Sequence, residues 1–534
     1  MQLPLLALPT AVLAASGILG APQPSNSNSQ RPSCGSLRPS PIPGVRYLDV
    51  QSREYTNATY PGAQAGTSVT LSFCEVNVTL THGKAGDRVL VSTWLPHEAD
   101  WNARFQGTGG GGYRAGTFGQ ALAPAVAQGY SAASTDAGID ANRPDGDFIL
   151  RNATGDVNLD LLTNFAGRSL HEMTLLGKDF TRQFYGGKRR FYSYWNGCST
   201  GGRQGMIEAQ RYPTDYDGIM ASAPAINWSQ FSPAGSFPNN QRVQSGYDGP
   251  TCELVEMQRR LIDACDALDG ARDGVIAALD RCQFDPHSIV GQRYTCAETG
   301  AELQFTQAAA DLVDVTWNGG RDAQGRKAWY GFERGTNLTQ ATAEDPSFAT
   351  YSQIWIRQAV KKDPQFDVTA LSQDELSRVI YQSYAEWNDL IGTSDPDLRK
   401  AYQHGTKILT WHGTSDQAIP FSGTIDYYTR TTDFLRVKGV EIDDFYRLFS
   451  APGVAHCRGG VGAAPDDPLQ AVVDWVEQGR APERLAATTQ DARKKKEDLC
   501  RYPKMATWNA QGDVECKVTD FSRNFKPLPR PPKV

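Results

Sequence analysis

The 534-residue chain carries 53 basic and 59 acidic side chains, which give a formal net charge of −6, and 40% of its residues are hydrophobic. This balance is typical of a globular protein, so it excludes an intrinsically disordered chain. Because there is no excess of basic residues, DNA and RNA are not expected as partners. The length predicts roughly two to four domains, or one large α/β domain with an insertion.

The N-terminal segment 1–20 predicts a secretory signal peptide. Residues 3–19 are almost wholly apolar, and the small residues at 14–17 suit cleavage by signal peptidase. An uncleaved anchor stays open as an alternative, because the segment has no Lys or Arg at its start. No later stretch reaches the roughly 18 uninterrupted apolar residues of a second span, so we expect a secreted, extracellular protein.

Short runs with the composition of β-strands recur along the chain, and each is followed by a turn-forming residue. They lie at 88–94, 191–195, 218–221, 407–411 and 446–450. Helical stretches separate several of them, which predicts a largely parallel α/β sheet with its chemistry at the carboxyl ends of the strands. Between about 228 and 404 this alternation of strand-like runs and helical stretches is replaced by helix-like segments such as 253–268 and 374–387. We interpret this part of the chain as an insertion.

Cysteines and glycosylation sequons both fit an extracellular protein. The ten cysteines form an even set without a Cys-x-x-Cys pair, which favours disulfides over zinc binding in a secreted chain. Asn-x-Ser/Thr sequons predict a glycoprotein modified at Asn57, Asn77, Asn152, Asn227 and Asn337.

The segment 197–201, Gly-Cys-Ser-Thr-Gly, has the pattern of a nucleophile elbow. It lies between the β-like run 191–196 and a helical stretch at 203–211. Such a turn is so tight that small residues must flank the serine, and it lifts the hydroxyl above the sheet. We therefore predict Ser199 as the nucleophile. The amide of Thr200, at the start of the helix, is a predicted donor to a developing oxyanion.

A serine nucleophile needs a base and an orienting acid, which in this fold follow it in the order Ser, Asp or Glu, His. The run 407–411 leads into Asp416, and the run 446–450 leads into His456. This order predicts Asp416 as the acid and His456 as the general base. His412 precedes the acid, and we interpret it as a histidine that packs its loop.

Two further features support this site. Cys198 directly precedes Ser199 and Cys457 directly follows His456, so a disulfide between them would be within reach if the two side chains meet. The Gly-rich run 107–112 predicts the amide of Gly110 as a second oxyanion donor, with a plain flexible loop as the alternative.

An Asp-rich segment within the insertion predicts a calcium site. Asp266, Asp269 and Asp273 fall within eight residues, and such a density of hard oxygen donors suits calcium. The carbonyls of Ala271 and Val275 would complete the ligand set. The alternative is a solvated acidic turn that is partly balanced by Arg272.

Three signatures together resemble the tannase and feruloyl esterase family: Cys198-Ser199 followed by Thr-Gly-Gly, Asp416 within His-Gly-x-x-Asp, and the pair His456-Cys457. The resemblance spans about 34–516 and includes the Gly-rich loop, the Asp-rich loop and Ser-Thr-Asp-Ala-Gly at 134–138. It implies an α/β-hydrolase core with a lid domain inserted before the acid strand. We thus expect a catalytic domain in two parts, 21–227 and 405–534, and a lid domain at 228–404.

The same resemblance implies a ligand set and a set of disulfides. The implied structural calcium would bind Asp266, Asp269, Asp273 and the carbonyls of Ala271 and Val275. The implied disulfides join Cys198 with Cys457, Cys34 with Cys74, Cys265 with Cys282, and Cys500 with Cys516. Cys252 and Cys296 are then paired by elimination.

As a function, the resemblance implies a secreted serine carboxylesterase that works through an acyl-enzyme. The expected substrates are feruloyl and p-coumaroyl esters of plant cell-wall polysaccharides such as xylan, as small esters or feruloylated oligosaccharides, and the alternative is a tannase that hydrolyses galloyl esters. A non-catalytic extracellular binding glycoprotein is an alternative of another class. We expect a monomer or homodimer, with an acyl pocket lined largely by lid aromatics among Trp317, Trp329, Tyr330, Phe332, Tyr351, Trp355 and Tyr381.

Overall fold

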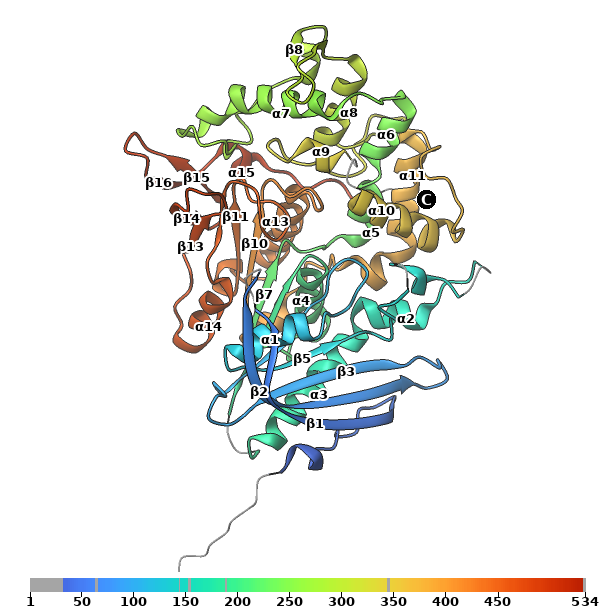
Figure 1. The fold of residues 1–534 in the computed structure, drawn as a ribbon, viewed down its shortest axis with the longest axis vertical. Helices are drawn as coiled ribbons and strands as arrows, with labels where there is room; N and C mark the ends of the chain where they lie inside the picture. The colour runs from blue at the N-terminus through green and yellow to red at the C-terminus, as the bar shows by residue number, and fades with distance from the viewer. Residues whose placement is uncertain are drawn as a thin grey trace, which may run out of the picture.

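The computed structural model describes residues 32–62, 66–143, 145–151, 155–187, 190–342 and 346–531. The predicted signal peptide at 1–20 and the sequon at Asn152 lie outside these residues. The fold is α/β, as expected, and is built on a nine-stranded sheet with the strand order β1-β2-β3-β5-β4-β6-β7-β10-β11 (Figure 1).

The sheet is parallel over the part that carries the predicted site. Its parallel strands are β4 (Arg104–Thr108), β5 (Ser131–Thr135), β6 (Tyr192–Cys198), β7 (Gly218–Ser222), β10 (Lys407–Gly413) and β11 (Tyr446–Ala451). Three antiparallel strands extend it at one edge: β1 (Val45–Pro61), β2 (Ser68–His82) and β3 (Val89–Pro96). The carboxyl ends of β6, β10 and β11 therefore lie at one edge, where ligands bind in sheets of this kind.

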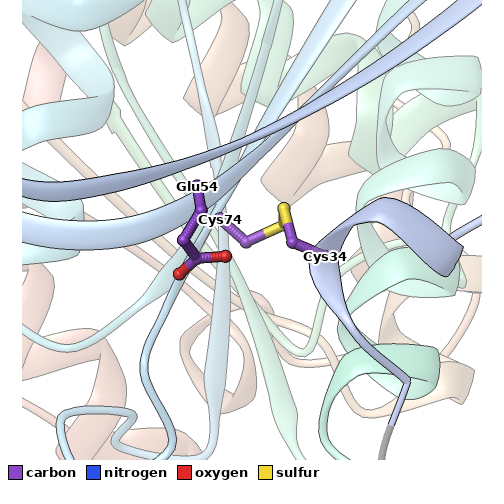
Figure 2. Close-up of side chains that lie close together, drawn as sticks. All are labelled: Cys34, Glu54 and Cys74. Carbon is purple, nitrogen blue, oxygen red and sulfur yellow. A yellow bond between two sulfur atoms is a disulfide. The ribbon is translucent and has the colours of Figure 1, made fainter.

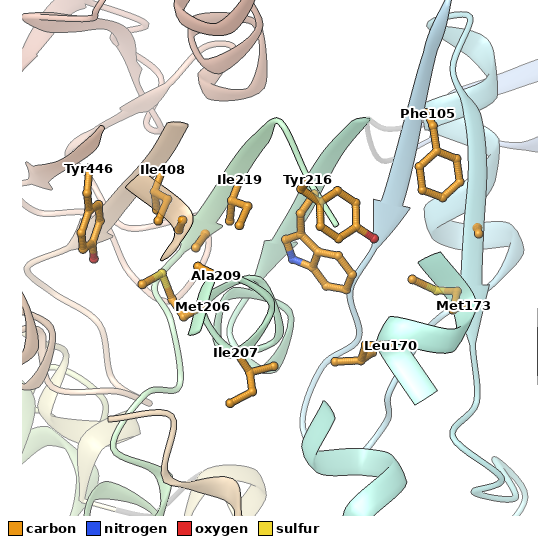
Figure 3. Packing of buried hydrophobic residues seen from close by; sticks show 14 of the residues in the cluster. Phe105, Leu170, Met173, Met206, Ile207, Ala209, Tyr216, Ile219, Ile408 and Tyr446 are labelled. Atoms are coloured by element: carbon orange, nitrogen blue, oxygen red, sulfur yellow. The ribbon is translucent and has the colours of Figure 1, made fainter. Parts of the chain in front are cut away.

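Helices cover both faces of the sheet because successive strand residues point to opposite sides. On one face Trp195, Ile219 and Ile408 pack into a core with helices α3 (Ser169–Phe184), α4 (Thr200–Arg211) and α13 (Phe421–Val437). Figure 3 shows residues of α3 and α4 within this core, among them Met173 and Met206. Their sequence neighbours in the strands, such as Tyr194 and Met220, face α1 (Gly119–Ala127) and α14 (Pro468–Gln478) on the other side.

The segment between β7 and β10 adds no strand to this sheet in the part of the chain that the structure describes. It holds the short hairpin β8 (Arg293–Thr295) and β9 (Glu302–Gln304) and the helices α5 (Trp228–Ala234), α6 (Phe237–Ser245), α7 (Thr251–Cys265), α8 (Gln307–Asn318), α9 (Leu338–Ala341), α10 (Pro346–Trp355), α11 (Gln373–Trp387) and α12 (Arg399–His404). Because it leaves from the end of β7, it emerges at the carboxyl edge of the sheet, and α6 to α11 lie above that edge in Figure 1.

After β11 the chain forms small antiparallel sheets that the sequence analysis did not predict. One contains β12 (Ala463–Pro465), β13 (Arg484–Thr489) and β14 (Lys496–Cys500), and the other contains β15 (Lys504–Trp508) and β16 (Val514–Val518), followed by α15 (Asp520–Asn524). The short helix α2 (Leu159–Thr163) precedes α3. No helix among the described residues is long and apolar enough to cross a membrane.

All ten cysteines are joined, in the five expected pairs. The disulfides are Cys34–Cys74, Cys198–Cys457, Cys252–Cys296, Cys265–Cys282 and Cys500–Cys516. Figure 2 shows Glu54 beside the first of them. This group is not a metal site, because its two sulfurs are bonded to each other and the Glu54 carboxylate binds His97 at 2.7 Å.

The asparagines of the glycosylation sequons differ in how far they are exposed. Asn57 and Asn337 are exposed and Asn77 is partly buried, whereas Asn227 has 0% exposure. The Asn227 side chain donates to the carbonyl of Gly423 at 3.3 Å and accepts from Arg430 at 3.2 Å. The prediction of a glycan at Asn227 is therefore wrong for this fold, since a glycan on this buried nitrogen would displace α13.

A buried ionic cluster fixes the antiparallel strands to the core. His82, at the end of β2, donates to Asp87 from Nδ1 at 2.6 Å and to Glu172 of α3 from Nε2 at 2.8 Å. Burial disfavours the charged imidazole, but the hydrogen bonds to Glu172 and Asp87 outweigh it and raise the pKa of His82. Burial also opposes ionisation of Asp87, yet its hydrogen bonds lower the pKa of that carboxyl to about 2.

This raised pKa makes the contribution of His82 to stability depend on pH. The contribution is complete below the unfolded-state pKa of about 6.5 and is lost as pH rises through the higher folded-state pKa. We expect His82→Gln to lower the melting temperature more at pH 5 than at pH 9, as followed by calorimetry. The control is His97→Gln, which breaks the exposed pair with Glu54; a pH-independent loss in the His82 variant would contradict the prediction.

Candidate active site

Ser199 occupies a strained turn between β6 and α4. Its backbone angles are φ 64° and ψ −123°, a left-handed conformation that non-glycine residues rarely adopt. The turn needs small neighbours, since a Cβ at Gly197 would lie 2.5 Å from the backbone of Gly201. The serine amide donates to the carbonyl of Ser222 at 3.1 Å, which ties the turn to β7. The side chain is only partly buried, so a substrate can reach it.

The structure brings the three predicted side chains together. His456 Nε2 lies 2.9 Å from Ser199 Oγ, and His456 Nδ1 lies 2.8 Å from Asp416 Oδ2. Because Asp416 is an acceptor when ionised, Nδ1 carries the proton in this arrangement and Nε2 is left to accept from the serine hydroxyl. This is the geometry of a nucleophile with its general base and its orienting acid.

Asp416 is fully buried and remains ionised. Burial opposes its charge, but the charge of His456 and hydrogen bonds from His412 and His456 outweigh burial and hold the pKa of this carboxyl well below its usual range. Its other oxygen, Oδ1, accepts from the amides of Ala418 and Ile419 at 2.8 and 2.9 Å. The acid is therefore held by four donors and can act only as a hydrogen-bond acceptor.

His412 lies closer to the chemistry than the sequence analysis predicted. We interpreted it as a loop-packing histidine, and it is indeed fully buried. Its Nε2, however, lies 3.0 Å from Asp416 Oδ2, the same oxygen that binds His456. The signal available in the sequence was its place four residues before the acid in the His-Gly-x-x-Asp run.

The disulfide between Cys198 and Cys457 ties the base loop to the nucleophile turn. The two Cα atoms are 6.0 Å apart, although 259 positions separate them in the chain. Each cysteine adjoins a triad residue, so the bond restricts how far Ser199 and His456 can move apart. The amide of His456 also donates to the side chain of Gln417 at 3.1 Å, which links the base loop to the acid loop.

The Gly-rich loop reaches the start of α4, but not as predicted. The amide of Gly110 donates to Gln204 Oε1 at 3.0 Å, so it is engaged within the protein. This contact speaks against Gly110 as the second oxyanion donor. Thr200 stays beside the site, and its hydroxyl donates to the carbonyl of Gly112 at 2.7 Å.

An aromatic residue from the segment between β7 and β10 contacts the Gly-rich loop directly. The ring of Tyr351 lies against Gly112, where a Cβ would be 3.1 Å from it, and the carbonyl of Tyr351 accepts from the Tyr113 hydroxyl. Tyr351 and Tyr330 are partly buried. The other aromatics considered for the acyl pocket are buried core residues: Trp317, Trp329, Phe332, Trp355 and Tyr381.

The Asp-rich segment lies against the base loop. A Cβ at Gly453, in the loop that carries His456, would be 2.7 Å from the side chain of Val275. Asp266 and Asp269 are buried at 9% and 4% exposure. Burial raises the pKa of Asp269 to about 6, and repulsion from Asp273 and Asp266 adds to it. These carboxylates accept hydrogen bonds from backbone amides, which carry no formal charge.

Comparison with known proteins identifies the family of this chain. The family model described as tannase and feruloyl esterase matches residues 74–523. A probable feruloyl esterase from Arthroderma benhamiae is 39% identical over 508 residues, which cover 91% of this chain and 94% of the relative. The chain belongs to the tannase and feruloyl esterase family.

Likeness to solved structures supports this assignment. A tannin acyl hydrolase from Aspergillus niger superposes with a TM-score of 0.83 at 28% identity, covering 92% of this chain and 95% of that one. Feruloyl esterase B from Aspergillus oryzae superposes with a TM-score of 0.76 at 25% identity, covering 90% and 98%. The chain is a carboxylic ester hydrolase of this family, which excludes the alternative of a non-catalytic binding glycoprotein.

We expect removal of the Cys198–Cys457 disulfide to impair turnover as well as stability. A bond across 259 positions strongly restricts the unfolded chain, so the double variant Cys198→Ala/Cys457→Ala should melt several degrees lower. It should also lose at least about tenfold in kcat, because nucleophile and base are no longer held together. Calorimetry and ester hydrolysis below the melting transition measure the two effects.

The matched control is Cys252→Ala/Cys296→Ala, which removes a disulfide within the insertion. This variant should melt lower and keep a kcat within about twofold of the wild type, because its cysteines do not adjoin the triad. Equal effects of the two double variants on kcat would contradict a positioning role for Cys198–Cys457.

Proposed function

We propose that this esterase hydrolyses hydroxycinnamoyl esters, feruloyl and p-coumaroyl, of plant cell-wall carbohydrates through Ser199, His456 and Asp416. The observation that carries the proposed ester hydrolysis by these residues is the 2.9 Å contact from His456 to Ser199 together with the 2.8 Å contact from His456 to Asp416. The relative from Arthroderma benhamiae, at 39% identity, is named a probable feruloyl esterase, whereas the Aspergillus oryzae tannase is 29% identical over 510 residues.

In the proposed reaction, the hydroxyl of Ser199 attacks the ester carbonyl while His456 Nε2 takes its proton. The tetrahedral intermediate collapses when His456 returns that proton to the leaving alcohol, and an acyl-enzyme forms on Ser199. Water, activated by the same imidazole, then releases the aromatic acid. Asp416 keeps the imidazole oriented throughout and stabilises its transient positive charge.

The proposed oxyanion donor is the amide of Thr200. It stands at the N-terminus of α4, where the helix dipole favours negative charge. The Thr200 hydroxyl binds Gly112, so the Gly-rich loop fixes the residue that would supply this amide. Preorganised donors of this kind lower the barrier because they need no rearrangement as the charge develops.

Galloyl esters are the second candidate substrate class. The fold likeness favours them, because the TM-score is 0.83 to the Aspergillus niger tannin acyl hydrolase and 0.76 to feruloyl esterase B. Sequence identity favours feruloyl esters, and the triad acts on both groups by the same chemistry. The preference between feruloyl and galloyl esters therefore depends on the pocket that receives the aromatic ring rather than on Ser199.

Hydrolysis of methyl ferulate and methyl gallate tests both parts of the proposal. Wild-type kcat/KM should be higher on methyl ferulate, and Ser199→Ala should lower kcat by at least about 10³-fold on either ester, because the acyl-enzyme can no longer form. The matched control is Ser222→Ala, which leaves the triad intact. A clear preference for gallate would overturn the feruloyl assignment, and an active Ser199→Ala variant would overturn the mechanism.

We further propose that the Asp-rich segment binds structural calcium through Asp266, Asp269 and Asp273 with the carbonyls of Ala271 and Val275. The donor chemistry fits, because the hard carboxylate oxygens of Asp266 and Asp269 are buried and burial raises the pKa of Asp269 and of the partly buried Asp273. Among the described residues their oxygens do not all lie within 4.8 Å of one another, so binding one ion through all three requires at least one side chain to rotate. Bound calcium would neutralise the repulsion between these carboxylates.

Removal of calcium should lower the melting temperature of the protein, because a ligand that binds only the folded state stabilises it. We expect excess chelator to lower it by several degrees, and added calcium, but not magnesium, to restore it. Asp269→Asn should abolish this calcium response, whereas Asp263→Asn, at an exposed ion pair on α7, should retain it. An unchanged melting temperature in chelator would refute the site.

We propose secretion as the route by which the enzyme meets its substrate. Five disulfides support it, because such bonds persist in oxidising extracellular conditions. We propose Asn57 and Asn337 as glycan sites, because both asparagines are exposed in the part of the chain that the structure describes. An extracellular location would also bring the enzyme to polymeric cell-wall substrates.

A further inference from the structure

A second histidine binds the proposed catalytic acid. Asp416 Oδ2 lies 2.8 Å from His456 Nδ1 and 3.0 Å from His412 Nε2, so two imidazoles share one carboxylate oxygen. Neither His412 nor Asp416 has any exposed surface. Bulk water therefore does not compete for this hydrogen bond, and without the histidine the negative charge would keep one protein donor fewer.

The partners of His412 determine where its proton is. Nε2 lies near Asp416 Oδ2 and also 3.1 Å from the carbonyl of Ile419, and both of these groups are acceptors only. Nε2 therefore carries hydrogen and donates. Nδ1 lies 2.8 Å from the hydroxyl of Thr424, which can donate to it. The neutral imidazole with hydrogen on Nε2 satisfies every contact.

The insertion contributes to this arrangement through Glu333. Thr424 belongs to the first turn of α13, and the amides of Phe421 and Ser422 at the start of that helix donate to the Glu333 carboxylate at 3.0 and 2.7 Å. Glu333 lies between β7 and β10 in the chain, outside the sheet. A continuous set of hydrogen bonds and covalent links thus runs from the insertion through α13 and His412 to Asp416.

We propose that His412 is a positioning residue for the catalytic acid, which it holds by donating from Nε2 to Asp416 Oδ2 while Thr424 fixes its ring. The proposal rests on the proposed function, in which Asp416 orients His456. With His412 present, the negative charge of Asp416 is shared between two donors on Oδ2. Without it, Asp416 attracts the protonated form of His456 more strongly and is less well fixed.

Three substitutions test this role. His412→Leu removes the donor and should lower kcat about 10- to 100-fold, the effect of losing a hydrogen bond to a charged group, with little change in KM. His412→Gln places an amide N–H near the position of Nε2 and should recover much of the loss. Thr424→Val removes the hydroxyl that fixes the ring and should give an intermediate kcat.

The pH dependence of kcat/KM separates positioning from a general structural role. The charged and titratable groups around His412 are Asp416, His456 through that carboxylate, and Glu333 from the insertion. In His412→Leu the acid limb should move to higher pH, because Asp416 retains the proton on His456 more strongly. A loss of stability alone would lower the melting temperature without moving this limb.

The control is His404→Leu on α12, where the imidazole binds Thr406 rather than a triad residue. It should leave kcat and the acid limb unchanged. If His412→Leu folds poorly, Thr424→Val and His412→Gln still decide the question. The inference is overturned if all three site variants keep wild-type kcat and acid limb while Ser199→Ala is inactive, whereas an active Ser199→Ala would instead overturn the proposed function.

Discussion

A carboxylate without any contact to solvent is the constraint around which the site is built. Isolated burial of a charge is very unfavourable, so Asp416 must be matched by donors from the surrounding structure. Two backbone amides bind one of its oxygens and two imidazoles bind the other. The same compensation that allows Asp416 to be buried also fixes its position, and this position orients His456 toward Ser199.

The remainder of the fold brings three distant segments to that carboxylate. Parallel strands β6, β10 and β11 end at one edge of the sheet and place the serine, the acid and the base on adjacent loops. The disulfide between Cys198 and Cys457 then fastens the base loop, which follows β11, to the nucleophile turn. The insertion contacts the site at several places, through Tyr351 at the Gly-rich loop, Glu333 at α13 and Val275 at the base loop.

The sequence predicts those features that depend on a few neighbouring residues. It does not predict features that depend on contacts with residues far away in the chain. The elbow at Ser199 and strands such as β10 are encoded within a few residues, so their positions were predicted closely. The small size of Gly110 predicts an oxyanion donor, but its amide binds Gln204, a partner that depends on α4 packing against the loop. Asn227 carries a sequon whose burial is decided by α13, about two hundred residues later. His412 gave no local sign of its bond to Asp416 beyond its spacing.

In the proposed reaction Ser199 forms a covalent acyl intermediate, and trapping that intermediate is the sharpest test of the mechanism. The enzyme would be quenched in acid during turnover of methyl ferulate and digested, and the peptides would be analysed by mass spectrometry. We expect one feruloyl group on the peptide that contains Ser199, attached to its hydroxyl. Rapid turnover with no acyl group on Ser199, or with the group on a different residue, would contradict it.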